Sequence, residues 1–403
     1  MAQEPSTTAR RPRHFSLFRD MAASSVVSGF VAVLVGYTSS AAIIFQAAEA
    51  AGASQAQIGS WLWALGIGTG LTTLGFSLRY RMPLLTAWST PGAALLATSL
   101  PGIAMSEAIG AFLFSALLIT LCGATGLFER VMHRIPPAIA SAMLAGVLLR
   151  FGLDVFVAME SRWLLPLSMF VAYLLAKRLW PRYAIVCVLA VGVVVALAQG
   201  LLDIGSVELA LAVPVFTMPS FSLPTLIGVG IPLFVVTMAS QNLPGIAVIR
   251  ASGYSPPLSP LIGWTGVATL LLAPFGGFAF NLAAITAAIC MGPEAHDQPA
   301  KRYTAAVAAG VFYLLMGVLG ATVTALFTAF PRELIMAIAG LALLATIGSG
   351  LATAVREDTH REAALITFLV TASGISLLGI GSAFWGLLAG LAALVVWRRS
   401  NKA

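Results

Sequence analysis

Long apolar runs alternate with short polar loops from residue 22 to residue 397 of the chain. A run of about twenty apolar residues is long enough for an α-helix to cross the hydrocarbon core of a bilayer. The pattern therefore predicts an all-α polytopic membrane protein. We expect fourteen transmembrane segments, at approximately 22–48, 58–78, 84–99, 106–128, 137–157, 163–179, 184–201, 223–249, 257–273, 275–292, 303–329, 334–355, 362–378 and 382–397.

The third and the tenth of these segments are too short and too interrupted to cross the membrane as plain helices. The third contains STPGAALLATS, where Ser89 and Thr90 are possible helix caps and Pro91 stands at a first helical position. The tenth contains PFGGFAFNLAAITAAIC, where Asn281 stands directly before the apolar run as a possible cap. We expect each segment to be a short extended piece followed by a half-helix that begins near mid-membrane, with Pro91 equivalent to Asn281 (281 − 91 = 190).

The two halves of the chain are similar to each other. LCGATGLFERVMHRIPPAIASAMLAGVLL, which begins at Leu121, overlays LMGVLGATVTALFTAFPRELIMAIAGLAL, which begins at Leu315 (315 − 121 = 194), and places Pro137 on Pro331. Each half then holds seven segments, and an odd number inserts the second copy upside down. Seven-plus-seven inverted repeats of this kind are typical of secondary transporters.

The distribution of basic residues supports this count, because cytoplasmic loops carry an excess of Lys and Arg. If the N-terminus is cytoplasmic, 19 of the 22 basic residues fall on the cytoplasmic side. Arg150, Arg162 and Arg332 fall on the other side. We therefore expect both termini in the cytoplasm. The spacing of Arg150 and Asp154, four residues apart on a predicted helix, favours an ion pair.

The composition is that of a protein embedded in a lipid bilayer, and it argues against a nucleic-acid-binding protein and an enzyme. Of the 403 residues, 59% are hydrophobic and 9% are charged, against about a quarter charged in a soluble chain. The net charge of +7 lies in small clusters between apolar runs, so it indicates topology and not nucleic-acid binding. The four histidines lie in predicted loops or the tail, and the three cysteines lie in apolar runs without metal-ligand spacing. We expect no enzyme, no metal and no cofactor.

The interruptions in the third and tenth segments are called the breaks below. Polar residues at their level are the candidates for a substrate site. A half-helix that begins at mid-membrane presents unpaired N–H groups and the positive end of its dipole, which favour an anion. The amides of Gln241, Asn242 and Asn281 are costly in lipid unless paired, so they are expected to face the ligand; hydrogen bonding to neighbouring helices is the alternative. The full set of expected substrate-binding residues is Ser39, Ser40, Gln46, Trp88, Ser89, Thr90, Pro91, Gly92, Gln241, Asn242, Phe278, Phe280, Asn281 and Leu282.

A proton carrier is harder to identify, because no charged residue falls at the middle of any predicted segment. Glu49, Glu294 and His296 lie near segment ends and are the candidates for proton coupling. The alternative for each is an ordinary loop or interfacial charge.

Three motifs carry a resemblance to a known family. MPLLTAWSTPGAALLATS, VTMASQNLPGIAV and PFGGFAFNLAAITAAICMGPEAH closely resemble motifs of the benzoate/proton symporter family, called BenE, and the likeness covers roughly residues 20 to 398. The resemblance implies the seven-plus-seven fold of nucleobase and sulfate-permease transporters, in which a core domain moves against a gate domain. It implies a cytoplasmic tail (1–20), a core domain (21–135 and 222–330), a gate domain (136–202 and 331–398), an extracytoplasmic connection (203–221) and a second cytoplasmic tail (399–403).

The resemblance also implies where and what the protein binds. Substrate is expected between the third and tenth segments, against the first and eighth, with homodimers formed through the gate domain. The nucleobase relatives use acidic residues where this chain has Gln241, Asn242 and Asn281, and the amides suit a carboxylate ligand. We expect import of benzoate or a related aromatic carboxylate across a bacterial-type inner membrane, by proton symport with elevator-like alternating access. The alternatives are another small organic anion, or an anion channel or uniporter on the same fold.

Overall fold

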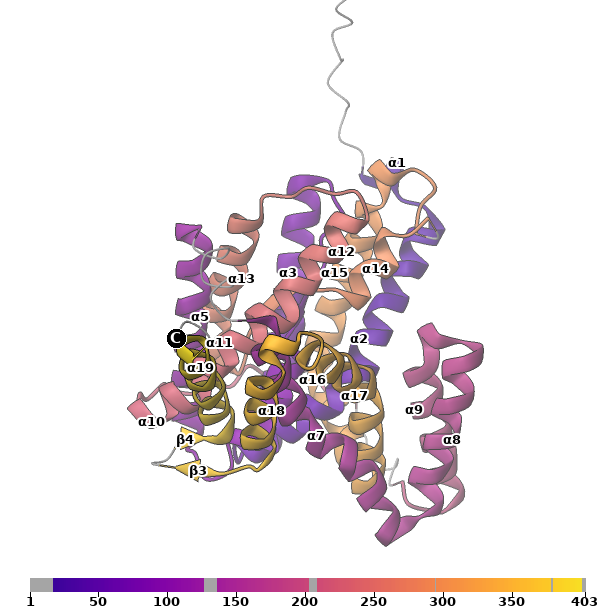
Figure 1. The fold of residues 1–403 in the computed structure, drawn as a ribbon. Coiled ribbons are helices and arrows are strands. Elements are labelled where there is room, and N and C mark those ends of the chain that lie inside the picture. The colour runs from indigo at the N-terminus through magenta and orange to yellow at the C-terminus, as the bar shows by residue number, and fades with distance from the viewer. Residues whose placement is uncertain (1–16, 127–135, 203–208, 294, 378–379, 401–403) are drawn as a thin grey trace, which may run out of the picture.

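The predicted segments are present as helices in the computed structural model, which describes residues 17–126, 136–202, 209–293, 295–377 and 380–400 (Figure 1). The first half contains α1 (Leu17–Asp20), α2 (Ala23–Ala50), α3 (Gln55–Tyr80), α4 (Thr90–Ser99), α5 (Met105–Thr125), α7 (Pro137–Arg162), α8 (Leu164–Leu179) and α9 (Ala184–Ala198). The second contains α10 (Leu223–Thr225), α11 (Ile231–Thr237), α12 (Leu243–Ala251), α13 (Leu258–Leu272), α14 (Ile285–Met291), α15 (Tyr303–Val318), α16 (Gly320–Ala329), α17 (Arg332–Ala354), α18 (Asp358–Ala372) and α19 (Ser382–Ser400).

Seven helical stretches in the described part of the chain are long and apolar enough to cross a membrane, or eight if α15 and α16, bent by 65°, form one span. The eighth segment is one of them, and it runs through α10, α11 and α12 with two π-helical turns, Leu226–Gly230 and Met238–Asn242. The prediction of a polytopic helical membrane protein is confirmed.

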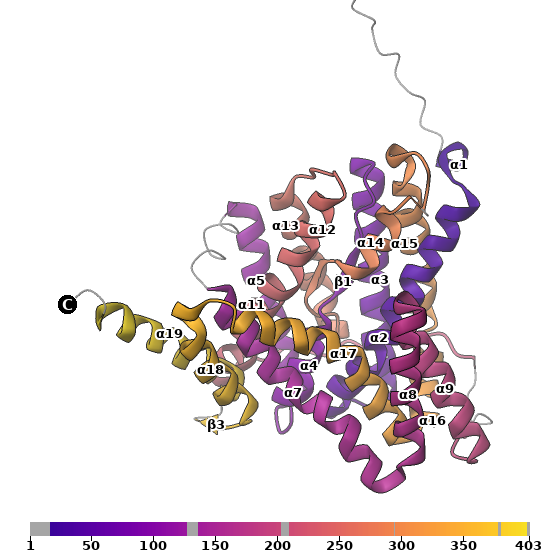
Figure 2. The same cartoon turned by 45° about the vertical axis from the view of Figure 1, so that its right-hand side comes forward.

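Helices from the two halves pack against each other in matched pairs. α3 packs along α15, α5 along α13, and α7 along α17, while α18 and α19 lie against α7 (Figures 1 and 2). Glycines allow the close crossings: a Cβ atom on Gly66 of α3 would lie 2.4 Å from the Gly317 Cα, and one on Gly123 of α5 would lie 2.2 Å from the Gly263 N. Gly123 and Gly317 are repeat equivalents (123 + 194 = 317), so both copies of the repeat use small residues at the same kind of helix contact.

The two broken segments meet in a short antiparallel ladder. β1 (Thr86–Trp88) precedes α4, β2 (Phe280–Leu282) precedes α14, and Ala87 pairs with Asn281 at the centre of the ladder. The offset of this central pair, 281 − 87 = 194, is the repeat offset, so Ala87 and Asn281 are repeat equivalents that pair with each other.

This ladder corrects one prediction. The equivalence of Pro91 and Asn281 is wrong by four residues, and Asn281 is not a helix cap. Its backbone belongs to β2, and α14 begins at Ile285 with Ala284 in the N-cap position. An Asn before an apolar run resembles a cap, but pairing with a strand 194 residues away determines its conformation.

An extended connection crosses the end of the bundle at which α2 ends and α3 begins. Its backbone N–H groups donate from Val215 to the Ser60 Oγ (2.9 Å) and from Thr217 to the Pro274 carbonyl (2.8 Å). It thereby ties the first turns of α3 to the segment that follows α13.

Candidate substrate site at the broken segments

The first broken segment forms the expected cap. Ser89 is the N-cap of α4, and its Oγ accepts a hydrogen bond from the Gly92 N–H at 3.0 Å. The Ala93 N–H donates to the Ser89 carbonyl, and Pro91 has no N–H to offer. The chain thus uses most first-turn donors itself, and in the described part of the chain the Thr90 N–H is left without a hydrogen bond.

Strained backbone at Ala279 joins the two broken segments. Ala279 has φ = 46°, a left-handed conformation that non-glycine residues rarely adopt. Its carbonyl accepts hydrogen bonds from the Ser89 N–H (3.1 Å) and from the Asn281 Nδ2 (3.0 Å). Strain of this kind persists only where the surroundings hold it, and it is concentrated at functional sites.

Asn242 connects the eighth segment to the second broken segment. Its Oδ1 accepts a hydrogen bond from the Leu282 N–H at 2.9 Å, and its Nδ2 lies 3.2 Å from the Met238 Sδ. Asn242 and Leu282 are fully buried, whereas Gln241, in the same π-helical turn, is half-buried. In this conformation the Leu282 N–H is therefore occupied by the protein itself. π-Helical turns are frequent at functional sites.

Three aromatic rings gather beside the ladder. Trp88 makes edge-to-face contacts with Tyr37 (5.0 Å between ring centroids) and Tyr313 (5.8 Å), and the two tyrosine rings lie 6.1 Å apart. The Trp88 Nε1 donates to the Ser40 Oγ at 2.9 Å, and the Ser40 hydroxyl donates to the Gly36 carbonyl. The broken third segment and the middle of α2 thus build one buried amphipathic cluster.

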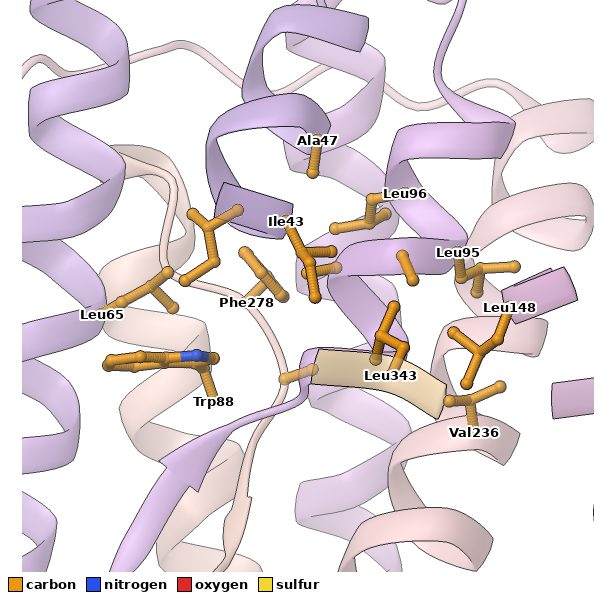
Figure 3. Packing of buried hydrophobic residues seen from close by; sticks show 14 of the residues in the cluster. Ile43, Ala47, Leu65, Trp88, Leu95, Leu96, Leu148, Val236, Phe278 and Leu343 are labelled. Atoms are coloured by element: carbon orange, nitrogen blue, oxygen red, sulfur yellow. The ribbon is translucent and has the colours of Figure 1, made fainter. Parts of the chain in front are cut away.

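The surroundings of this cluster are apolar. Figure 3 shows side chains from six helices around the breaks: Ile43 and Ala47 of α2, Leu65 of α3, Leu95 and Leu96 of α4, Leu148 of α7, Val236 of α11 and Leu343 of α17. Because water is excluded there, an electrostatic interaction or hydrogen bond with a bound molecule counts for more than it would at the surface.

Some buried polar atoms near the breaks have no hydrogen-bond partner among the described residues. They include the Tyr37 hydroxyl, the Asn281 Oδ1 and the Thr237 Oγ1 of α11. An unsatisfied buried polar group costs about 1–3 kcal/mol, so natural proteins keep few of them. A ligand that pairs with these atoms would recover that free energy.

The aromatic residues of the second broken segment pack into the protein. A Cβ atom on Gly68 would lie 2.1 Å from the Phe280 Cζ, so the Phe280 ring rests directly on α3. The Phe278 ring belongs to a separate aromatic cluster, with its centroid 5.8 Å from that of Trp61 and 5.6 Å from that of Phe112. A ligand-facing role for Phe278 and Phe280 stays a prediction.

The remaining expected residues are spread along α2. Ser40 is buried at the aromatic cluster, and Gln46 lines a separate cavity described below. The side chain of Ser39 lies outside the described residues.

The structure does not bring the proton-coupling candidates together. Glu49 lies at the C-terminal end of α2, whereas the loop carrying His296 is fixed to the start of α2 by a hydrogen bond from the Ser25 Oγ to the Ala295 carbonyl. At a rise of 1.5 Å per residue, Ser25 and Glu49 lie about 36 Å apart along the helix. Glu294 lies outside the described residues.

Sequence reasoning missed Tyr37 and Tyr313. Tyr37 directly precedes the polar group Thr38–Ser40, and a hydroxyl in an otherwise apolar span was a usable signal. Tyr313 had no comparable signal, because only the packing of α15 against α2 brings it to Trp88.

Comparison with solved structures identifies the fold. The transmembrane domain of the cyanobacterial bicarbonate transporter BicA superposes with a TM-score of 0.58 at 14% sequence identity, over 93% of this chain and 98% of that one. SLC26A9 superposes with a TM-score of 0.56 at 13% identity, over 98% of this chain and 73% of that one. The fold is the seven-plus-seven inverted repeat of these transporters.

Comparison of sequences identifies the family. The inner membrane protein YdcO of Escherichia coli (strain K12) is 51% identical over 372 residues, which cover 92% of this chain and 95% of that protein. The benzoate membrane transport protein of Acinetobacter baylyi is 41% identical over 381 residues, which cover 94% and 97%. The family model described as benzoate membrane transport protein, BenE, matches residues 19–396. This chain therefore belongs to the BenE family of membrane transporters.

Proposed function

We propose that this protein imports benzoate or a closely related aromatic carboxylate across the bacterial inner membrane by proton symport. The name of the relative that is 41% identical supports the substrate. The observation that carries the proposal is the buried cluster of Tyr37, Trp88 and Tyr313 at the breaks, with its unpartnered Tyr37 hydroxyl. An aromatic carboxylate needs both an apolar, ring-lined slot and a few polar groups to orient it.

In this proposal the aromatic ring of the substrate lies among the three aromatic side chains. These rings contact one another in the structure, so binding requires one of them to move. Tyr37 is the side chain we expect to move, because the Trp88 indole is held by Ser40. Once displaced, the Tyr37 hydroxyl donates to the carboxylate, as does the Thr90 N–H, and the amide N–H groups of Gln241 and Asn281 donate to it as well.

The proposed movement is elevator-like. The core domain, built on α2 to α5 and α10 to α16, carries the site past a gate domain of α7 to α9 and α17 to α19, which also forms a homodimer. Both termini are cytoplasmic in this proposal. Glu49 and His296, at opposite ends of α2, are the proposed proton-coupling residues on the two sides of the membrane.

The test is uptake of radiolabelled benzoate into proteoliposomes, with and without an inward proton gradient. We expect accumulation above equilibrium that an uncoupler abolishes. Tyr37→Phe and Asn281→Ala should each raise KM, whereas Ser349→Ala, at an exposed position of α17, should leave it unchanged. Equilibration of benzoate without accumulation would indicate a uniporter or channel and not a symporter. The absence of benzoate flux in folded protein would reject the proposed substrate.

A further inference from the structure

A large cavity opens at the end of the bundle opposite α1. It has a volume of about 580 Å³, within the range of small-molecule sites. Its walls come from the C-terminal ends of α2 and α4, the middle of α7, the end of α16 and the start of α17. In Figure 2, α4, α7, α16 and α17 lie below β1, whereas α1 lies at the top and α2 runs down from it. In the proposed topology, the cavity therefore faces the extracytoplasmic side, between the core and gate domains.

Two arginines line this cavity without an ion pair. Arg150 of α7 and Arg332 of α17 are both exposed, and within the described ranges no carboxylate oxygen lies within 4 Å of either guanidinium. The ion pair favoured by the spacing of Arg150 and Asp154 is absent. By contrast, Arg162, at the end of α7, forms an ion pair in which its Nε lies 3.3 Å from the Glu333 Oε1. The two cavity arginines thus keep their guanidinium groups available, and a guanidinium binds a carboxylate through two parallel hydrogen bonds.

The wall beside the arginines is aromatic. Phe45 of α2 stacks with Phe327 of α16 (5.9 Å between centroids), and Phe327 makes an edge-to-face contact with Phe330 (5.6 Å). These three rings and Phe151 all line the cavity. A molecule with one carboxylate and one flat apolar ring matches this combination of guanidinium groups and phenyl rings.

Two carboxylates in the same cavity weaken its attraction for an anion. Asp154 interacts electrostatically with both arginines, and Glu49 interacts with Arg332. The four groups carry no net formal charge together, so an anion is attracted locally by the guanidinium groups and not by an overall positive field. A site that a substrate occupies only on its way to another site must bind it weakly and reversibly.

The half-helix α4 connects this cavity to the proposed substrate site at the breaks, called the central site below. Thr98, near the C-terminal end of α4, lines the cavity, and Thr90 begins α4 at the breaks. Eight residues of helix separate them by about 12 Å. Thr98 and Arg150 also line a neighbouring cavity of about 440 Å³, so Arg150 stands where the two cavities adjoin.

We propose that the cavity lined by Arg150, Arg332 and the phenylalanine cluster is a capture site that binds the aromatic carboxylate before it reaches the central site. The inference rests on the proposed function. The arginines hold the carboxylate, the phenyl rings hold the apolar body, and Glu49 and Asp154 keep the affinity low enough for release.

The first experiment measures the kinetics of benzoate uptake into proteoliposomes over a range of benzoate concentrations from below KM to saturation. Arg150→Gln and Arg332→Gln should each raise KM about fivefold or more with little change in the maximal rate, and the lysine variants should recover part of the loss. Arg162→Gln, which removes a paired arginine on the same helix, should leave KM unchanged.

The sign of the Asp154→Asn effect separates capture from a purely structural role. Removal of a negative charge from a capture site lowers KM, whereas disruption of a structural network impairs transport as the arginine variants do. An unchanged KM in both arginine variants, or a raised KM in Asp154→Asn, would overturn the inference.

A second measurement does not depend on folding of the arginine variants or on transport. Met336→Cys places a thiol in the cavity wall, and its labelling by a negatively charged thiol reagent is compared with that of the unsubstituted protein. Benzoate should slow this labelling, in a Tyr37→Phe background as well. Protection without uptake would support the capture site and reject the proposed function, whereas labelling unaffected by benzoate would reject the capture site even if uptake is normal.

Discussion

The hydrogen bond between Asn242 and Leu282 joins the eighth segment to the broken tenth, and its removal can be predicted in detail. The Leu282 N–H donates to the Asn242 Oδ1 at 2.9 Å, and both residues are fully buried. Asn242→Ala leaves this backbone N–H without an acceptor in an apolar environment. A buried donor deprived of its partner costs about 1–3 kcal/mol, to which the lost contact with the Met238 sulfur adds little.

The measurement is the unfolding temperature of purified protein in detergent. Asn242→Ala should lower it by several degrees. Gln241→Ala is the matched control, because Gln241 is the adjacent residue and is only half-buried. It should leave the unfolding temperature nearly unchanged while weakening benzoate binding. An Asn242→Ala protein as stable as the unsubstituted one would refute this reasoning.

Three further substitutions test other parts of the site. Tyr37→Phe removes a buried hydroxyl that has no partner among the described residues, so stability should hold or rise while benzoate affinity falls about tenfold, as titration calorimetry would show. Ser89→Ala removes the side chain that accepts a hydrogen bond from the Gly92 N–H, and it should lower the stability by about 1 kcal/mol, measured by the unfolding temperature. Ser89→Thr, which keeps a hydroxyl acceptor, should retain most of the stability. Gly276→Ala places a Cβ atom 1.9 Å from the Trp61 Cδ1 at a residue with φ = 92°, so expression of folded protein, measured by size-exclusion chromatography, should collapse.

The sequence predicted those parts of the structure that depend on local signals. Hydrophobic runs gave the helices, and Ser89 before Pro91 gave the cap of α4. The repeat offset of 194, found from Leu121 and Leu315, also holds at the ladder, where Ala87 meets Asn281. The separate alignment through Pro91 failed because it relied on a cap pattern and not on the repeat.

Contacts between distant parts of the chain were beyond local reasoning. Tyr313 reaches Trp88 through the packing of α15 on α2, and Asn242, in a π-helical turn, meets Leu282 40 residues further along the chain. Spacing favoured a pair between Arg150 and Asp154, but the structure leaves that arginine unpaired in a cavity that four other helices complete. A sequence indicates which side chains are unusual for a membrane, and the tertiary structure decides which of them meet.

The central claim is that an aromatic carboxylate binds at the breaks, and its most direct test is to locate a heavy atom on the substrate. A bromine-substituted benzoate that competes with benzoate for transport would be bound to the purified protein, and its bromine located by anomalous scattering. The account predicts bromine density among the rings of Tyr37, Trp88 and Tyr313. Bromine found only elsewhere, for example only in the cavity lined by Arg150 and Arg332, would contradict it.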